Sequence, residues 1–131
     1  MPHTEKPLPP LRVLVVDDDP DTATSQFDLL TLCGFVVKAV TDGDTALRVV
    51  HEFRPDVILT DLMMPGISGI ELARRITATG VSPPPFLVAV TGCYGDDLRA
   101  SEGSGFDLVL IKPVDPEVLI STLRRIAANR K

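Results

Sequence analysis

The sequence predicts a doubly wound α/β domain in which helices cover both faces of a five-stranded parallel sheet. Two observations lead to this prediction. Short runs rich in β-branched residues alternate along the chain with longer segments that carry helix signals, and the short runs are almost entirely apolar, which is typical of strands buried on both faces. A chain of 131 residues with 44% hydrophobic and 24% charged residues has the size and composition of one globular domain.

The predicted strands share short length, apolar character and β-branched side chains. They are LRVLVV at 11–16, FVVKAV at 35–40, DVILT at 56–60, FLVAV at 86–90 and DLVLI at 107–111. Lys38 interrupts the second run, which favours an edge position for that strand.

The first predicted helix follows Asp19 and Pro20, which suit the N-cap and the first helical position. Gly34 can end this helix, because glycine readily adopts the left-handed conformation that follows many helices. The apolar residues at helical spacing, which we expect to be buried, are Ala23, Phe27 and Leu30. Residues 43–52 form the second predicted helix, which the sequence RPD ends.

Two later helices also have clear signals. Ser68 is the expected N-cap of the third helix, and Gly80 lies beyond its end. Its expected buried face is Ile70, Ala73 and Ile76. The last helix, in DPEVLISTLRRIAANRK, is amphipathic through Leu119, Leu123 and Ile126. A fourth helix is expected near residues 96–102. We expect it to be short and loose, because the glycines and serines of YGDDLRASEGSG are unfavourable in helix interiors.

The ends of the chain and its charge limit the function. Residues 1–10 contain four prolines and are expected to form a flexible lead, and residues 11–128 the domain. The net charge of −5 argues against nucleic acid as a partner of this domain. The start of the chain lacks the apolar core of a signal peptide, and no apolar run approaches the length needed to span a bilayer. We therefore expect a cytoplasmic protein with no membrane partner.

Polar side chains follow four of the predicted strands. Asp17 and Asp18 come after the first strand, Asp61 after the third, Thr91 after the fourth and Lys112 after the fifth. Because the carboxyl ends of parallel strands meet at one edge of a sheet, and ligands bind there in such folds, we expect these side chains to form one site.

The composition of this cluster suggests phosphoryl chemistry. Three neighbouring carboxylates must take up protons or bind a cation, and oxygen ligands without His or Cys favour Mg²⁺. Lys112 and Thr91 would complete a cradle for a phosphoryl group. Asp61 is the best-placed nucleophile, because it precedes the loop LMMPGISG, whose glycines permit close approach of the backbone.

The chain resembles the receiver domain of two-component response regulators over residues 11–128. The resemblance is carried by Asp17-Asp18, by TDLMMPGISGIEL around Asp61, by Thr91 and by Lys112-Pro113, in that order. It implies a flavodoxin-like fold with strand order 2-1-3-4-5. It further implies that a histidine kinase or a histidine phosphotransfer protein phosphorylates Asp61, which switches a surface recognised by a downstream protein.

The resemblance also implies a role for each residue of the cluster. Asp18 and Asp61 would bind Mg²⁺ directly, together with the carbonyl oxygen of Met63, whereas Asp17 would act mainly through water. Lys112 would pair with the phosphoryl group, Thr91 would donate a hydrogen bond to it, and the Lys112-Pro113 peptide would be cis. Such a domain is not an enzyme with a separate substrate, because it catalyses only its own phosphorylation and dephosphorylation.

Other interpretations remain open at this point. Asp17, Asp18 and Asp19 could cap the first helix, which we expect to be the main role of Asp19. The chain could also be a Mg²⁺-dependent phosphohydrolase with its nucleophile after the first strand, or a degenerate receiver that only binds proteins. The segment GFDLVLIKPVDPEVL is similar to receivers attached to hybrid histidine kinases. A chain of 131 residues leaves no room for an output domain beside the receiver, so we expect either a free single-domain regulator or an excised receiver.

One position departs from the family pattern. Many receivers have an aromatic residue or a histidine three residues before the lysine, where this chain has Val109. The short β-branched side chain of valine cannot swing between exposed and buried rotamers as a ring does. We therefore expect the phosphorylation signal to pass through ordering of residues 92–105.

Overall fold

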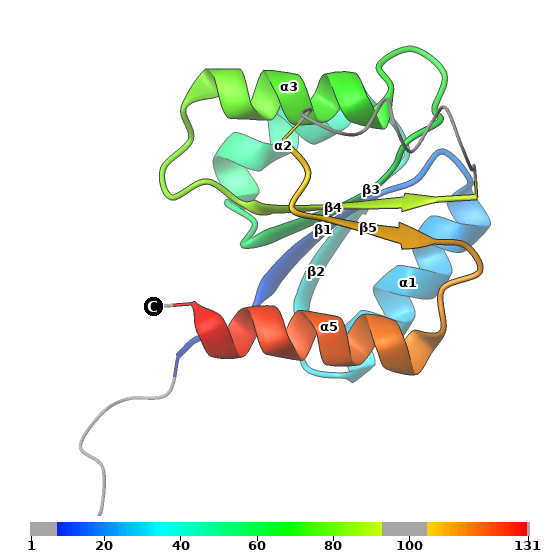
Figure 1. The fold of residues 1–131 in the computed structure, drawn as a ribbon, viewed down its shortest axis with the longest axis vertical. Coiled ribbons are helices and arrows are strands. Elements are labelled where there is room, and N and C mark those ends of the chain that lie inside the picture. The colour runs from blue at the N-terminus through cyan, green and yellow to red at the C-terminus, as the bar shows by residue number, and fades with distance from the viewer. Residues whose placement is uncertain (1–7, 93–104, 131) are drawn as a thin grey trace, which may run out of the picture.

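Five parallel strands form one sheet in the order β2-β1-β3-β4-β5, which confirms the predicted fold class and strand order (Figure 1). The structure, a computed structural model, describes residues 8–92 and 105–130. The strands are β1 (Arg12–Val16), β2 (Val36–Val40), β3 (Val57–Asp61), β4 (Phe86–Thr91) and β5 (Leu108–Ile111). Each bound lies within one residue of its prediction, and β2 lies at an edge, as Lys38 indicated.

Each described helix begins directly after an N-cap residue, and two of these caps, Asp19 and Ser68, were predicted. The described helices are α1 (Pro20–Leu32), α2 (Gly43–Phe53), α3 (Gly69–Thr79) and α5 (Pro116–Asn129). Each begins after a residue whose side chain accepts a hydrogen bond from a backbone N–H of the first turn: Asp19, Asp42, Ser68 and Asp115. The short helix expected near residues 96–102 lies outside the described residues.

The end of α1 shows why Gly34 was correctly identified as its terminator. Gly34 has a φ of +95°, a conformation that glycine adopts without the steric cost of a side chain. Its N–H donates to the carbonyl of Thr31, and the N–H of Phe35 donates to that of Leu30. These two bonds satisfy carbonyl groups that would otherwise be left free at the helix end.

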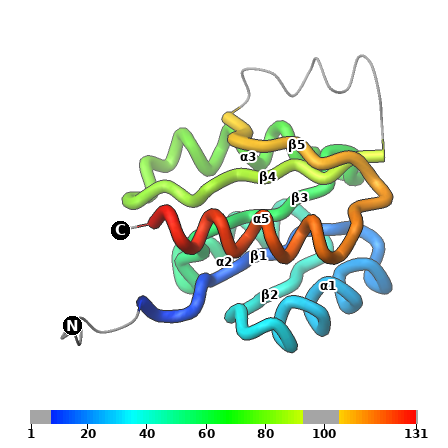
Figure 2. The backbone as a smooth tube through the Cα atoms, turned by 60° about the horizontal axis from the view of Figure 1, so that its bottom comes forward, coloured from blue at the N-terminus to red at the C-terminus, as the bar shows by residue number. Residues whose placement is uncertain are grey.

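Of the described helices, α1 and α5 pack on one face of the sheet and α2 and α3 on the other (Figures 1 and 2). Successive strand residues point to opposite faces, so Val13 and Val15 contact the core under α1 and α5, whereas Leu14 and Val16 contact the core under α2 and α3. The four residues are all buried, which is why β1 contains apolar residues at every position after Arg12.

The predicted buried faces of two helices need correction. In α1, Ala23 and Leu30 are buried, but Phe27 is 37% exposed. The prediction for Phe27 was wrong because the buried side of α1 is turned toward Gln26 and Leu29, which are partly buried. In α3, Ala73 and Ile76 are buried as expected, whereas Ile70 is only partly buried and Leu72 occupies the core instead.

Two aspartates fix the register of neighbouring strands at the end of the sheet where the strands begin, which we call the amino edge. Asp56 precedes β3, and its N–H and its carboxylate both pair with the backbone of Arg12 at 2.8 Å. Asp107 precedes β5 and pairs in the same way with the backbone of Leu87 at 2.8 Å. The predicted strands at 56–60 and 107–111 begin one residue too early, because Asp56 and Asp107 bond to the neighbouring strand through their side chains.

Arg130, which directly follows α5, contacts the same edge. Arg130 Nη1 lies 3.2 Å from the carboxylate of Asp56, and its Nη2 donates to the carbonyl of Pro9. Both ends of the described chain therefore meet near the amino edge, at the left of Figure 1. None of the helices in the described residues is long and apolar enough to cross a membrane.

Candidate functional site

The opposite end of the sheet, which we call the carboxyl edge, brings together the residues that the sequence predicted to meet. Asp17 directly follows β1, Asp61 ends β3, Thr91 ends β4 and Lys112 directly follows β5. Parallel pairing sets these strand ends level with one another: Asp61 is opposite Val90 in β4, and Thr91 is opposite Ile111 in β5.

Lys112 is the cation of this edge among the described residues. Its Nζ lies 3.2 Å from Asp61 Oδ2 and 3.4 Å from Asp17 Oδ2. Partial burial lowers the pKa of Lys112 and is the largest single influence on it, but the hydrogen bonds and charges of Asp61 and Asp17 together outweigh burial. The net result is a raised pKa, so the side chain stays protonated at neutral pH.

Asp17 is held rigidly. Its side chain is buried, with only 4% of the residue exposed. Oδ1 accepts a hydrogen bond of 2.9 Å from the N–H of Asp19, and Oδ2 faces the ammonium of Lys112. Asp19 itself caps α1 through hydrogen bonds from Thr22 and Asp21, so the three consecutive aspartates have separate roles.

The backbone around Asp61 is shaped by a glycine. The N–H of Gly69 donates to the carbonyl of Leu62 at 2.9 Å, and a Cβ added at Gly69 would lie 2.2 Å from the carbonyl oxygen of Asp61. No other residue fits so close to a backbone oxygen. The first turn of α3 therefore packs directly on the residue that the sequence proposes as nucleophile, as the glycines of the loop predicted.

The Asp61 carboxylate has one oxygen toward Lys112 and one toward the following loop. Oδ2 pairs with Lys112, and Oδ1 accepts a weak hydrogen bond of 3.3 Å from the N–H of Met63. Met63 is 57% exposed, so its side chain does not hold the loop in the core, whereas Met64 is buried.

Thr91 lies at the same edge with its side chain fully buried. Its carbonyl accepts a hydrogen bond of 2.8 Å from the N–H of Lys112, so the positions of Thr91 and Lys112 are fixed relative to each other by the backbone. The Lys112-Pro113 peptide is cis, as the resemblance implied. Val109 is partly buried in β5, and residues 93–104 of the expected signalling segment, with Cys93, lie outside the described residues.

The carboxylates at this edge suit a hard cation. Asp17, Asp18 and Asp61 each offer an oxygen, and the three oxygens lie within 4.8 Å of one another. One ammonium against three carboxylates leaves an excess of negative charge, which a divalent cation would neutralise. An all-oxygen donor set with an exposed member, Asp18, fits Mg²⁺, which keeps several of its waters.

Sequence reasoning missed one contact that supports the site. Gly43, the first residue of α2, packs on Ile67 in the loop between β3 and α3, and a Cβ added at Gly43 would lie 2.8 Å from Ile67 Cβ. No periodicity or cap marks this pair, because its two residues belong to elements that are separate in sequence. The glycine directly after the cap Asp42 was the only signal.

Comparisons with known proteins agree with this geometry. The family model described as "Response regulator receiver domain" matches residues 13–124. A curated relative, DNA-binding response regulator MtrA of Mycolicibacterium smegmatis, is 39% identical over 113 residues, which cover 86% of this chain and 49% of the relative. The Virulence sensor protein BvgS of Bordetella bronchiseptica is 37% identical over 95% of this chain and 10% of its own length. The chain thus spans about half the length of MtrA.

Solved structures share the fold at modest identity. The chemotaxis protein CheY4 of Vibrio cholerae superposes with a TM-score of 0.82 at 27% identity, over 89% of this chain and 98% of that one. The signal receiver domain of a signal transduction histidine kinase from Syntrophus aciditrophicus gives 0.82 at 28% identity, over 92% of each chain.

Proposed function

Because this chain belongs to the response regulator receiver family of two-component signalling, we propose that Asp61 is the residue on which it accepts a phosphoryl group. The observation that carries the proposal is the ion pair between Asp61 Oδ2 and Lys112 Nζ at 3.2 Å, at the edge where Asp17 and Asp18 also lie. No described cation other than Lys112 faces the cluster, so the ammonium marks the side from which a phosphoryl group would be neutralised.

The proposed step is an in-line transfer. An oxygen of the Asp61 carboxylate forms a bond to phosphorus while the P–N bond of a donor phosphohistidine breaks, and the imidazole nitrogen keeps the electron pair. Lys112 holds one of the phosphoryl oxygens by charge and a hydrogen bond, and the Thr91 hydroxyl donates to another. Gly69 keeps the backbone of Asp61 in place during the transfer, because α3 packs directly on its carbonyl.

We propose Mg²⁺ as the cofactor, bound directly by carboxylate oxygens of Asp18 and Asp61 and by the carbonyl oxygen of Met63, with Asp17 acting through water. The ion would supply positive charge for the phosphoryl oxygens. Asp17 is already engaged by the Asp19 N–H and by Lys112, which supports its assignment to a water-mediated role. Asp18 is exposed and free of such constraint, which supports direct binding.

The proposed phosphodonors are a histidine kinase and a histidine phosphotransfer protein, and the proposed output is a change in the surface presented to a downstream protein. The relatives show two settings for such a domain, since MtrA is named as a DNA-binding regulator and BvgS as a sensor protein. We propose that the chain turns over only its own acyl phosphate.

The test is labelling by a small phosphodonor. The wild type and the variants Asp61→Asn and Asp56→Asn are incubated with acetyl phosphate and Mg²⁺, and intact mass and tandem mass spectrometry after borohydride trapping report the modified residue. Wild type and Asp56→Asn should gain one phosphoryl group on Asp61, and Asp61→Asn should gain none while its circular dichroism spectrum is unchanged. Undiminished labelling of Asp61→Asn, or a label on Asp17, would exclude Asp61 as the acceptor; a label on Asp17 would favour the phosphohydrolase.

A further inference from the structure

A cavity lies at the amino edge of the sheet, far from Asp61, between the loop before β4 and the helix α5. We call it the amino-edge pocket. Its volume is about 790 Å³, within the range of small-molecule sites. We propose that this pocket binds a small anion that carries an apolar ring, such as an aromatic carboxylate.

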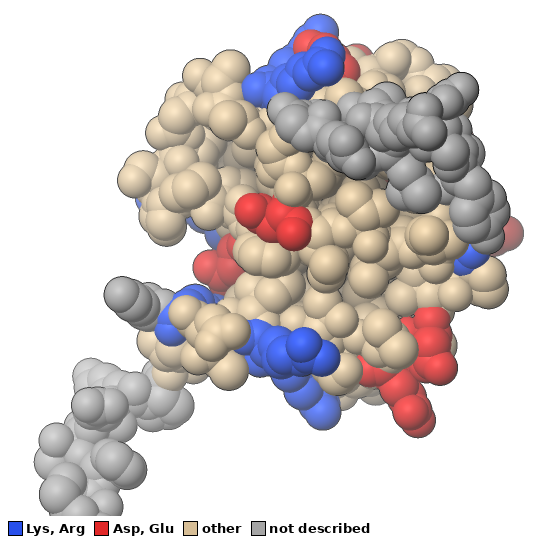
Figure 3. Space-filling model, in the orientation of Figure 1, with Lys and Arg blue, Asp and Glu red and all other residues tan. Residues whose placement is uncertain are grey.

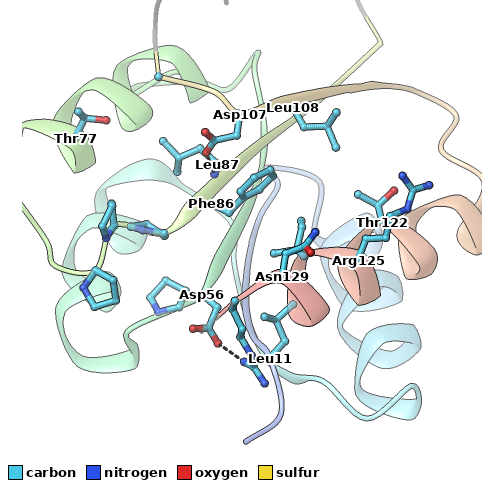
Figure 4. Close-up of a pocket in the computed structure, with 17 residues that line it drawn as sticks. Leu11, Asp56, Thr77, Phe86, Leu87, Asp107, Leu108, Thr122, Arg125 and Asn129 are labelled. Atoms are coloured by element: carbon cyan, nitrogen blue, oxygen red, sulfur yellow. Dashed lines mark hydrogen bonds and ion pairs between the residues drawn. The ribbon is translucent and has the colours of Figure 1, made fainter. Parts of the chain in front are cut away.

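The walls of the amino-edge pocket are apolar. Its lining includes Pro83, Pro84, Pro85 and Ile126, and the ring of Phe86 lies among the lining side chains (Figure 4). Proline and phenylalanine rings offer flat, rigid surfaces that lose little conformational freedom when a ring packs on them. These surfaces account for the ring in the proposed ligand.

The carboxylates of the pocket already have protein partners. Asp56 Oδ2 accepts hydrogen bonds from the Arg12 N–H and from Arg130 Nη1. Asp107 Oδ2 accepts from the Leu87 N–H. The charge of Asp56 is therefore offset by Arg130, whereas Asp107 forms no ion pair with any residue that the structure describes.

Two arginines and an asparagine bring N–H donors to the pocket. Arg130 Nε is completely buried and has no hydrogen-bond partner among the described residues. Arg125 lines the pocket from the exposed side of α5, as Figure 4 shows, and forms no ion pair with any residue that the structure describes. Asn129 adds an amide on the same helix.

The hydroxyl groups of the pocket do not change this balance. Thr77 Oγ1 donates to the Ala73 carbonyl and Thr122 Oγ1 to the Val118 carbonyl, both within their own helices. Figure 3 shows Lys and Arg side chains gathered over the end part of α5 and acidic ones gathered where α5 begins. The α5 side of the pocket therefore presents the unpaired guanidinium of Arg125 and the amide of Asn129, which together suit an anionic group.

This inference does not rest on the proposed phosphorylation of Asp61. The pocket contacts the beginning of β4 at Phe86, whereas the phosphoryl site lies at its end, Thr91. Six residues of an extended strand separate the two by roughly 17 Å. Binding at the amino-edge pocket can therefore be measured on the unphosphorylated chain without Mg²⁺.

The probe is 2-naphthoate, and 2-naphthamide is its neutral counterpart of nearly the same shape. Titration of the full ¹⁵N-labelled chain should move the amide signals of residues 86–87, 105–108 and 125–130, and nuclear Overhauser effects should join the naphthalene ring to Phe86. The amide should bind about tenfold more weakly, because it lacks the charge that pairs with arginine. Shifts centred on Lys112 and Asp61 instead would overturn the proposal, as would the absence of shifts at the pocket with naphthoate in the millimolar range.

Two neighbouring arginines provide a matched pair of variants. Arg125 lines the pocket, whereas Arg124 is an equally exposed residue of α5 that does not. Both can be replaced without disturbing the core. Arg125→Gln should weaken naphthoate binding about tenfold and leave the weak binding of naphthamide unchanged, and Arg124→Gln should change neither. Equal loss in the two variants would show that only general surface charge attracts the probe and would refute the site.

Discussion

The two ends of the sheet use aspartates in opposite ways. At the amino edge, Asp56 and Asp107 each pair with a backbone N–H of the neighbouring strand, so one oxygen of each carboxylate is bonded by the fold itself. At the carboxyl edge, three carboxylates share the single ammonium of Lys112 among the described residues. Aspartates therefore stabilise the fold at the amino edge, whereas the three carboxylates at the carboxyl edge repel one another.

The repulsion between the carboxylates is large enough that a bound cation would stabilise the fold. Two charges within 4.8 Å of each other repel by roughly 3 kcal/mol at an effective dielectric constant near 20. Lys112 offsets part of this for Asp17 and Asp61, whereas Asp18 lies on the exposed side of the cluster. A fold that is stable only by a few kcal/mol gains most from a ligand that neutralises such a cluster.

The largest expected effect comes from removing the cation of the carboxyl edge. Lys112→Met should slow phosphorylation of Asp61 on the order of a hundredfold, because one preorganised charge at the phosphoryl oxygens is lost. The metal should still stabilise this variant, and by more than the wild type, since no ammonium competes with it for the carboxylates. Labelling rates and melting temperatures with and without Mg²⁺ measure the two effects separately. Wild-type labelling by Lys112→Met would show that the lysine is only structural.

The second largest effect is stabilisation by Mg²⁺, which tests whether the carboxylates of the carboxyl edge repel one another. Saturating Mg²⁺ should stabilise the wild type, by about 2.7 kcal/mol at a hundredfold excess over its Kd. Asp18→Ala should lose most of this gain, yet in chelator it should be no less stable than the wild type, because it removes one of the repelling charges. Urea unfolding with Mg²⁺ and with chelator measures both. A wild type whose stability ignores Mg²⁺ would contradict the metal site.

Removal of an aspartate from the amino edge should lower the stability of the fold, whereas Asp18→Ala should not lower it in chelator. Asp107→Ala removes the acceptor of the Leu87 N–H, and an unpaired donor at a partly buried strand should destabilise the fold by about 1 kcal/mol. Because Asp107 is remote from Asp61, labelling at saturating Mg²⁺ should keep the wild-type rate. Urea midpoints and acetyl phosphate labelling of the same preparations check the contrast with Asp18→Ala; loss of stability in both variants in chelator would remove the distinction between the edges.

The sequence predicted the carboxyl edge better than the amino edge, for a physical reason. In a parallel sheet the residues just after the strands must meet, so Asp17, Asp61, Thr91 and Lys112 could be brought together from strand order alone. The role of Asp107 depends on which backbone N–H lies opposite, which is a matter of strand register. Register comes from packing of both faces at once and leaves no local signal.

The errors inside the helices have a similar origin. Helical spacing correctly placed Ala23 and Leu30 in the core, but it could not tell that the buried side of α1 is turned away from Phe27. The contact of Gly43 with Ile67 depends on how α2 meets the loop after β3. Both depend on the packing of separate elements, which periodicity within one element does not describe.

The smallest expected effect concerns a carboxylate that lies at the carboxyl edge without belonging to the site. Asp42 follows β2 and caps α2, and its carboxylate accepts hydrogen bonds from the N–H of Thr45 at 2.7 Å and from its hydroxyl at 2.9 Å. These two bonds lower the pKa of Asp42 below its ordinary value of 3.8. Its satisfied oxygens resemble those of the amino edge, so position at the carboxyl edge is not by itself what makes an aspartate available to a ligand.

The pH dependence of stability tests this directly. Because the folded-state pKa of Asp42 is depressed, its contribution is complete above the unfolded-state pKa near 3.8 and is lost as the pH falls through the folded-state pKa. Asp42→Asn keeps an N-cap acceptor but cannot titrate. Wild type and variant should therefore converge in stability as the pH is lowered below about 4, with a difference of only about 0.5 kcal/mol at neutral pH for so exposed a group. Urea midpoints in chelator measure the difference, which should not respond to Mg²⁺; a metal-dependent difference would place Asp42 within the cation site after all.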